Sequence, residues 1–484
     1  MRLIDRIANR LGYAKKTSRR AYAAAAVNRL TASWTISNRT GDEELKTALR
    51  PLRARSRELV QNNDHARKFM KMVSANVIGA AGITLQSKVK QPDGGLDIGA
   101  NSIIEEAWAR WGSKGTPTVC GQYSWADVQR VAVESVARDG EILIRKDRTF
   151  PNGFGFALQL IEADHLDENY NRELKGGGRI TMGVEFDAYG RPAAYHLLTR
   201  HPGSNTYEYG GKKYERVPAD QIIHMYVKDR PTQSRGVPWM HSAMTRLNML
   251  GAFEDAAVIN ARVGASKMGF FTRTDEAAEY AGDGDNGANM EMEAEPGTLT
   301  QLPPGVDFKE WNPQYPNSEF ADFEKAMLRS ISSGLNVSYT SLASDLEGVN
   351  YSSIRQGVLD ERDHWRMLQG WMIEHLCNEV FADWLLMSLT TGALGKLPPS
   401  KYDKFNAPVW QPRGWGWVDP LKDVKAQVEA INAGLKTRAS AVAEQGLDLM
   451  DVFEQLAEED KLAEKFKLGL KNTQNLNDGG GKQI

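Results

Sequence analysis

Several features that define common protein classes are scarce or missing in this chain of 484 residues. It has two cysteines, Cys120 and Cys377, which lie far apart and in no CxxC or Cys/His cluster. Their spacing excludes a disulfide scaffold and a cysteine-based zinc site, and it fits a reducing compartment. No apolar run reaches the roughly 18 residues of a membrane span, so the sequence predicts no transmembrane helix.

The motifs of common catalytic and nucleotide-binding classes are also missing. The chain has no HExxH, no GxSxG and no phosphate-binding loop ending in GK[ST]. We therefore expect no cofactor, no metal ion and no enzyme active site. One group of acids, Glu162, Asp164 and Asp167, follows an expected strand. A surface turn accounts for it best, but clustered carboxylates can bind catalytic metal ions, so a DNA-processing enzyme of a mobile element stays open as an alternative.

Neither sign of charge dominates the sequence. Lys and Arg number 60 against 62 Asp and Glu, a formal net charge of −2. Proteins that bind DNA tightly are usually basic, so any affinity for polyanions has to come from a local patch. The first 20 residues carry seven basic side chains, which favours a mobile basic arm over residues 1–29 or an amphipathic helix. Residues 274–300 carry eight acids and no base, typical of a solvated loop.

Hydrophobic periodicity predicts an α+β chain with a mostly antiparallel sheet. A stripe of apolar residues spaced 3, 4, 4 and 4 apart ends at Leu335 and predicts a helix capped at Asn317 or Ser318. Other helices are expected at 42–76, 125–137, 238–266, 352–389, 421–433, 439–444 and 449–467. Alternating patterns predict strands at 141–146, 157–161, 183–186, 194–198 and 222–227.

A basic run, Arg53, Arg55 and Arg57, lies in the first expected helix. Alternate residues of a helix do not share one face. The run could contact phosphate, or its members could pair with acids of the same chain. The sequence leaves both readings open.

Eight groups of short motifs follow one another over about residues 50 to 460, each weakly specific alone. They are Arg55-Ser56-Arg57 with Asn62-Asn63; Val77-Ile78-Gly79 with Gly82-Ile83; Asp139-Gly140-Glu141; Ile161-Glu162-Ala163-Asp164; Gly183-Val184-Glu185 with Gly190-Arg191-Pro192-Ala193-Ala194-Tyr195; Arg235-Gly236-Val237-Pro238; Asn350-Tyr351-Ser352-Ser353 with Arg355; and Trp417-Val418-Asp419-Pro420. Together with the order of helix, acidic loop, capped helix, polar loop and very long helix, they resemble the portal proteins of tailed bacteriophages, lambda-type family.

The resemblance implies a portal fold: an α/β wing, two long stem helices, a clip and a helical C-terminal crown. Carried over by position, the parts are a basic N-terminal arm at 1–29, the wing at 30–237, stem helices at 238–266 and 317–335, the clip at 267–316, a channel loop at 336–349, a long helix with the wing return at 350–418, the crown at 419–470 and a disordered tail at 471–484. The acidic run in the clip has no counterpart in this pattern.

The resemblance also implies a function. Portals form a ring, usually of twelve subunits, at one capsid vertex of the virion; they assemble in the host cytoplasm. The large terminase pumps DNA through the ring during packaging, and DNA leaves through it on ejection. Partners would be further copies of the chain, the large terminase, major capsid and scaffold proteins, head–tail adaptors and non-specifically contacted double-stranded DNA. A capsid-associated adaptor other than the portal is a third reading.

On the portal hypothesis, three sets of residues become candidates for contact with DNA or with partner proteins. Lys325 and Arg329, four apart on the second stem helix, would give sparse positive rings in the channel, unless they pair with Glu324 or Asp322. In the channel loop, contacts to DNA without sequence preference would come from Ser338, Tyr339, Thr340 and Ser341. The clip would present acids to the terminase or an adaptor, namely Glu291, Glu293 and Glu295.

Overall fold

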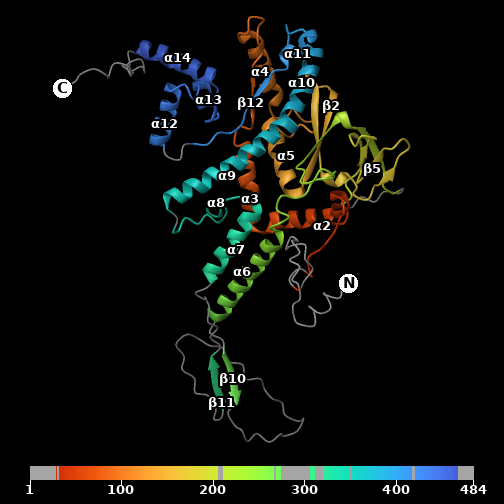
Figure 1. Ribbon diagram of the computed structural model, residues 1–484, viewed down its shortest axis with the longest axis vertical. Coiled ribbons are helices and arrows are strands. Elements are labelled where there is room, and N and C mark those ends of the chain that lie inside the picture. Colours follow the sequence, from red (N-terminus) through yellow and green to blue (C-terminus); the bar gives the residue numbers. More distant parts are fainter. Residues whose placement is uncertain are drawn as a thin grey trace, which may run out of the picture.

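The computed structural model describes residues 29, 32–204, 211–265, 269–273, 306–310, 320–348, 350–416 and 420–466. A body of helices and sheets carries a helix pair that projects from one end, and the last helices lie at the opposite end (Figure 1). The predicted α+β class is confirmed. The expected arm, acidic run and tail fall almost entirely outside the described residues.

The first helical region consists of two helices rather than one. Helix α2, Gly41–Asn62, begins at Thr40, whose side chain accepts the Glu43 N–H, and it contains Pro51 without a break. Asn63 separates it from α3, Asp64–Val73, because the Asn63 side chain caps α3 by accepting the Ala66 N–H. A π-helical turn, η2, Ser74–Ile78, follows.

Two segments far apart in the chain then meet. Strand β1, Thr84–Ser87, pairs antiparallel with β12, Pro408–Gln411. The chain enters β1 through Gly79 and Gly82, whose φ values of 76° and 83° favour glycine. Helix α4, Ile98–Gly112, follows β1.

The sheets of the body are antiparallel, as expected. Helix α5, Trp125–Asp139, precedes a sheet of order β3-β2-β9. A second sheet of order β4-β5-β6-β7-β8 lies beside it (Figure 1). The strands are β2 Glu141–Phe150, β3 Gly155–Ile161, β4 Arg172–Glu173, β5 Arg179–Thr181, β6 Val184–Phe186, β7 Pro192–Leu198, β8 Tyr214–Pro218 and β9 Ile222–Tyr226. Short 3-10 turns join them at η3 Ala163–His165 and η4 Ala219–Gln221.

The projecting pair consists of α6, Met244–Ala265, and α7, Phe320–Leu335. The ring of Phe253 stacks on Phe320 at 5.4 Å and so joins the two helices. Helix α6 was expected from residue 238 but begins at Met244, because residues 239–243 form turns. Beyond the pair, β10, Gly269–Arg273, pairs antiparallel with β11, Val306–Glu310.

The long helix expected at 352–389 is one continuous run with a wider turn inside it. Helix α9, Tyr351–Met372, passes through the π-helical η5, Ile373–Cys377, into α10, Asn378–Thr390. The chain then returns through η6 Pro399–Lys401 and α11 Tyr402–Phe405 to β12. Three final helices match expectation closely: α12 Pro420–Asn432, α13 Arg438–Ala443 and α14 Leu449–Phe466.

Tryptophans dominate the core of the body. The ring of Trp108 lies 4.8 Å from Trp111, 4.9 Å from Trp384 and 5.7 Å from Trp410. Since these residues come from α4, α10 and β12, the cluster fixes three distant segments together. The indole N–H of Trp111 donates to the Phe156 carbonyl at 3.0 Å, which ties α4 to β3. Within the described part of the chain, no helix has the length and hydropathy to cross a bilayer.

Candidate functional site

The residues expected to face DNA lie on α7 and on a short helix after it. Lys325 and Arg329 belong to α7. The segment 336–349, expected to be a loop, contains a short helix, α8, Tyr339–Ala343. Ser338 starts α8 by accepting the Ser341 N–H at 3.2 Å, and Ser344 ends it in the left-handed region with φ 56°. Ser338 is therefore occupied as a helix cap.

Lys325 pairs with acids that follow α8. Its Nζ lies 3.2 Å from Glu347 Oε2 and 3.7 Å from Asp345 Oδ2. The expected ion pairs with Glu324 or Asp322 are not formed. The hydrogen bond to Glu347 and the charge of Asp345 raise the pKa of Lys325, so the ammonium stays charged at neutral pH. The charge is partly neutralised by its own chain.

Arg329 contacts a tyrosine rather than an acid. Its guanidinium lies over the Tyr339 ring at 5.4 Å. The Tyr339 hydroxyl donates to Asp345 Oδ2 at 2.7 Å, and partial burial and this bond raise the tyrosine pKa to about 12. Asp345 is therefore linked to both candidate cations. It pairs with Lys325 directly, and it reaches Arg329 through Tyr339, the residue of α8 that lies under the Arg329 guanidinium.

Thr340 and Ser341 line a hollow of about 470 Å³ between α8, α3 and α9. Helix α8 is held against α9 by Glu361, whose Oε2 accepts the Ser338 N–H at 3.1 Å. Lys68 of α3 reaches the same hollow and hydrogen-bonds to Ser344. The candidate segment is thus an ordered part of the surface. It presents hydroxyl groups and paired charges, with one lysine of α3 beside it. Glu291, Glu293 and Glu295 lie outside the described residues.

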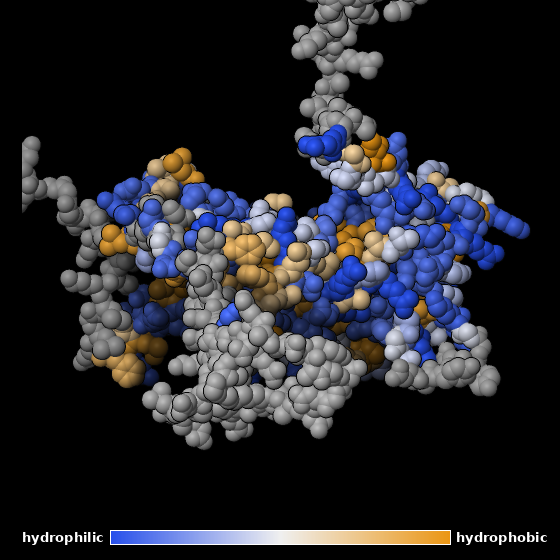
Figure 2. All heavy atoms as spheres, turned by 90° about the horizontal axis from the view of Figure 1, so that it is seen from below, coloured by the Kyte–Doolittle hydropathy of each residue, from blue (hydrophilic) through white to orange (hydrophobic). Residues whose placement is uncertain are grey.

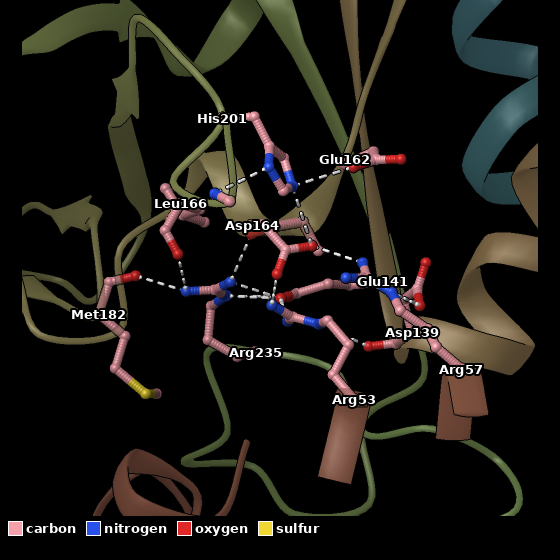
Figure 3. Close-up of polar contacts among 12 residues, drawn as sticks. Arg53, Arg57, Asp139, Glu141, Glu162, Asp164, Leu166, Met182, His201 and Arg235 are labelled. Atoms are coloured by element: carbon pink, nitrogen blue, oxygen red, sulfur yellow. Dashed lines mark hydrogen bonds and ion pairs between the residues drawn. The ribbon is translucent and has the colours of Figure 1, made fainter. Parts of the chain in front are cut away.

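A buried ion network that the sequence did not predict lies in the body (Figure 3). Glu141, at the start of β2, is fully buried and accepts from Arg235 Nε at 2.8 Å and from Arg53 Nη2 at 2.8 Å. His224 Nε2 lies 2.8 Å from its other oxygen, which also accepts the Gly236 N–H. Burial alone would raise the pKa of Glu141, but Arg235, His224 and Arg53 together hold it far below its usual range.

Arg235 is satisfied on every side. Besides Glu141, it donates to the carbonyl oxygens of Leu166 at 3.0 Å, Met182 at 2.8 Å and Ala163 at 3.2 Å. These carbonyls come from the connections around η3 and β6, so one side chain ties the edge of both sheets to the segment that leads into α6. The network therefore fixes where the projecting pair begins.

The segments around Gly140 and Gly236, which belong to two of the motif groups, cross here with their backbones in contact. Gly140 has φ 92°, and a Cβ there would lie 2.7 Å from the backbone of Gly236. A Cβ on Gly236 would lie 2.0 Å from the Gly140 carbonyl oxygen. The motifs around Glu141 and Arg235 are thus one structural unit, and glycine is required because two main chains touch.

The basic run of α2 serves this network too. Arg57 Nε lies 2.7 Å from Asp139, and the other end of its guanidinium bonds to Asp164. Arg53 is buried beside Glu141, whereas Arg55 is exposed. The pairing interpretation is therefore correct for Arg53 and Arg57.

The acids considered for metal-dependent cleavage do not form one cluster. Asp167 accepts from Lys212 and from the Tyr214 hydroxyl, both at 2.7 Å. Glu162 and Asp164 lie instead beside His201. In the described part of the chain, these three form the one group of three or more His, Cys, Asp or Glu residues whose ligand atoms are close enough together to hold a metal ion. His201 Nδ1 accepts the Gly203 N–H at 3.0 Å, so Nε2 carries the proton and faces Glu162 at 3.1 Å. An imidazole nitrogen that carries a proton has no lone pair to offer a metal ion.

Comparison with known proteins identifies the family. A family model described as "Phage portal protein, lambda family" matches residues 27–369. The chain belongs to the lambda family of phage portal proteins. The match extends from the N-terminal region before α2 into α9 and so includes the Glu141 network and the DNA-facing candidates.

Relatives extend the likeness along the rest of this portal chain. A probable portal protein of Halomonas phage phiHAP-1 is 37% identical over 468 residues, covering 94% of this chain and 89% of the relative. Portal protein B of Escherichia phage lambda is 22% identical, and the match covers 91% of this chain and 88% of the relative. The portal protein of Escherichia phage N15 is 21% identical over 88% of the chain and 87% of its own.

Among solved structures, this portal chain is similar to chains in particles of a gene transfer agent. A neck of the empty particle, computed with C6 symmetry, matches with a TM-score of 0.42 and 15% identity over 81% of this chain and 93% of that chain. A neck of the native particle, computed with C12 symmetry, matches with a TM-score of 0.42 and 12% identity over the same shares.

Proposed function

We propose that copies of this chain form a ring at one capsid vertex, through which DNA enters during packaging and leaves on ejection. The observation that carries this function is membership of the lambda portal family over residues 27–369, with a 37% identical portal relative along nearly the whole chain. In this role the chain is a structural conduit, and the enzyme that drives DNA is the large terminase. The protein belongs to the virion vertex and assembles in the host cytoplasm.

We assign the parts of a portal by position. The wing is 30–237 with the return at 350–418, the stem is 238–266 and 317–335, the clip is 267–316, the channel segment is 336–349 and the crown is 419–470. Support comes from the way α6 and α7 project side by side from the body toward β10 and β11, while α12, α13 and α14 lie at the other end (Figure 1).

A ring requires surfaces that bind other copies of the chain. Large apolar side chains are exposed on α6, among them Met249, Val258 and Ile259. Seen from the end of the projecting pair, apolar groups lie between larger hydrophilic areas (Figure 2). Toward the crown, Leu421 and Leu435 are 80% and 85% exposed. Burial of such groups favours assembly, since water excludes apolar surface.

The candidate channel residues suit a conduit that lets DNA slide. Each phosphate that a protein neutralises adds affinity, and six to ten such contacts make binding tight. Asp345 and Glu347 already pair with Lys325, so this lysine is only a weak partner for phosphate, and Arg329, over the Tyr339 ring, adds one further cation. Hydroxyl groups of Thr340 and Ser341 add contacts without sequence preference.

The remaining partners follow from the same role. The clip acids Glu291, Glu293 and Glu295 would face the terminase and later a head–tail adaptor. Capsid and scaffold proteins would contact the wing. Double-stranded DNA would pass without being recognised by sequence.

Particle mass and shape test the proposal. Light scattering over a range of protein concentrations, with negative-stain electron microscopy, is expected to find rings with a central hole and about twelve times the 53.8 kDa chain mass. A chain that stays monomeric at every concentration and cleaves DNA when magnesium is added would contradict the portal role and support the enzyme alternative.

A further inference from the structure

A cavity of about 350 Å³ lies between α9, α12 and the segments on either side of α13. Three arginines of α9 line it, Arg355, Arg362 and Arg366. Because they are seven and four residues apart, they share one helix face and form a stripe about 16 Å long. The opposite wall includes Trp415, Lys436 and Glu444.

Three guanidiniums gather around one indole in this region. Those of Arg366, Arg362 and Arg413 lie 5.5, 5.8 and 5.9 Å from the Trp415 ring. The Trp415 N–H donates to Asn76 Oδ1 at 3.1 Å, which fixes the ring against η2. The indole thus attracts three guanidinium groups that would otherwise repel one another and holds them close together.

The acids among the lining residues are already paired. Asp423 bonds to Arg355 at 3.0 Å, and Glu444 bonds to Lys436. Arg366 pairs at the surface with Asp363. Arg362 donates from Nη2 to the Gly416 carbonyl at 3.1 Å, and among the described residues its buried Nε has no hydrogen-bond partner. A buried donor of a charged group without an acceptor is costly.

The pKa values of two of these arginines also indicate positive charge without a nearby acid to balance it. Burial, and then the charges of Arg366 and Arg413, lower the pKa of Arg362. Burial also lowers the pKa of Arg413, which bonds to the Ala75 carbonyl and to Asn76 rather than to an acid. Both remain protonated, because guanidinium loses its proton only at very high pH.

We propose that this cavity binds a phosphate group, held by Arg362 with Arg366. A guanidinium presents a planar fork of donors that matches phosphate oxygens. The phosphate could come from a DNA strand or from free phosphate, and the stripe favours DNA, because a strand presents successive phosphates along it whereas a single ion fills one position.

The cavity shares lining residues with the hollow beside the segment expected to face DNA. Arg362 and Trp415 also line the hollow that contains Thr340 and Ser341. Helix α8 lies beside α9, the helix that carries the stripe (Figure 1). The DNA source of the phosphate rests on the proposed portal function; the phosphate chemistry of the cavity does not.

The test compares the full-length protein with Arg362→Gln and with the matched control Arg110→Gln. Arg110 is exposed on α4 and lies outside this cavity, so the control removes the same charge elsewhere. One arm measures the thermal shift caused by inorganic phosphate against chloride at constant ionic strength. The other titrates a short fluorescent DNA duplex at several salt concentrations.

Arg362→Gln is expected to abolish most of the phosphate shift, to weaken duplex binding about tenfold, and to lower the salt slope by about one. Arg366→Gln, which changes an exposed side chain, should weaken both readouts in the same direction even if Arg362→Gln folds poorly. Loss of the phosphate shift alone assigns the site to free phosphate; loss in both arms assigns it to DNA.

Wild-type behaviour of both variants in both arms would overturn the site. So would a ring structure in which a carboxylate of a neighbouring copy fills the cavity. Ring formation, scored by negative-stain microscopy on the same samples, tests the portal role independently. Absent rings with an intact phosphate shift would count against the portal role only.

Discussion

Two groups of polar side chains are each centred on one carboxylate, in opposite surroundings. Around Glu141, two arginines and a histidine enclose one fully buried carboxylate, and no partner can leave without exposing a charge to a dry interior. Around Asp345, Lys325 and Tyr339 hold a carboxylate that water reaches. The first group fixes structure, because a buried ion cannot be left unpaired. The second can exchange partners, because solvent screens each contact.

The largest expected effect comes from breaking the buried group. Arg235→Met removes the bidentate partner of Glu141 and three donors to main-chain carbonyls. We expect the free energy of unfolding to fall by about 3–5 kcal/mol, measured by urea denaturation. Arg55→Met, an exposed change on α2, is the control and should shift it by less than about 0.5 kcal/mol. Equal stability of the two variants would show that the network does not hold the body.

Gly236→Ala tests the same junction through shape instead of charge. The new methyl group would overlap the Gly140 carbonyl, so the two motif segments have to separate at a cost of about 1–3 kcal/mol or more. Gly370→Ala is the matched control. Gly370 is helical and nothing lies within 4 Å of an added Cβ, so this change should raise the thermal midpoint slightly. A tolerated Gly236→Ala would mean that the crossing is loose.

The buried group also predicts the direction of a pH dependence. Burial lowers the pKa of His224 below 6.5, and the pKa of Glu141 is depressed from 4.5. Stability from both is therefore complete above pH about 6.5 and falls as acid protonates first His224 and then Glu141. His224→Gln should flatten the thermal-midpoint curve just below pH 6.5, and His241→Gln, outside the network, should not. Burial also lowers the pKa values of His65 and His364, so these two groups add a slope of the same sign.

The exposed group should give the smallest change in stability and a clear change in function. Lys325→Glu with Arg329→Glu breaks contacts that solvent screens, so ring assembly and the thermal midpoint should stay close to wild type. Packaged DNA should fall, because the channel face gains acids. The yield of nuclease-protected DNA in assembled particles is the measurement. Normal yield would remove these residues from the channel surface.

Much of the architecture could be predicted from periodicity, and the errors have physical causes. The strands beginning at Glu141 and Pro192 and the three final helices follow from alternation and helical spacing. Helix α8 was missed because one capping side chain, Ser338, starts it within a polar segment. The partners of Lys325 were wrong because neighbours on a helix were considered, whereas a turn after α8 brings Asp345 and Glu347 back.

The buried network was beyond the reach of local reasoning. Glu141 and Arg235 are 94 residues apart, and no pattern in one segment names its partner in the other. The available signal was chemical: a glutamate opens an apolar strand directly after a glycine, and an arginine precedes a second glycine. Such residues are expensive to bury alone, so their pairing could have been suspected but not assigned.

The π-helical turn η5 in the long helix has a consequence for changes in chain length. Its wider hydrogen-bonding pattern accommodates one residue more than a regular turn. Trp365 and Met372 before it and Trp384 after it are all buried, although their spacing drifts from a strict helical period. Deleting one residue within Ile373–Cys377 would convert the turn to regular helix while leaving both halves facing as they do now. The long helix can therefore differ by one residue in length without moving the elements packed against its two halves.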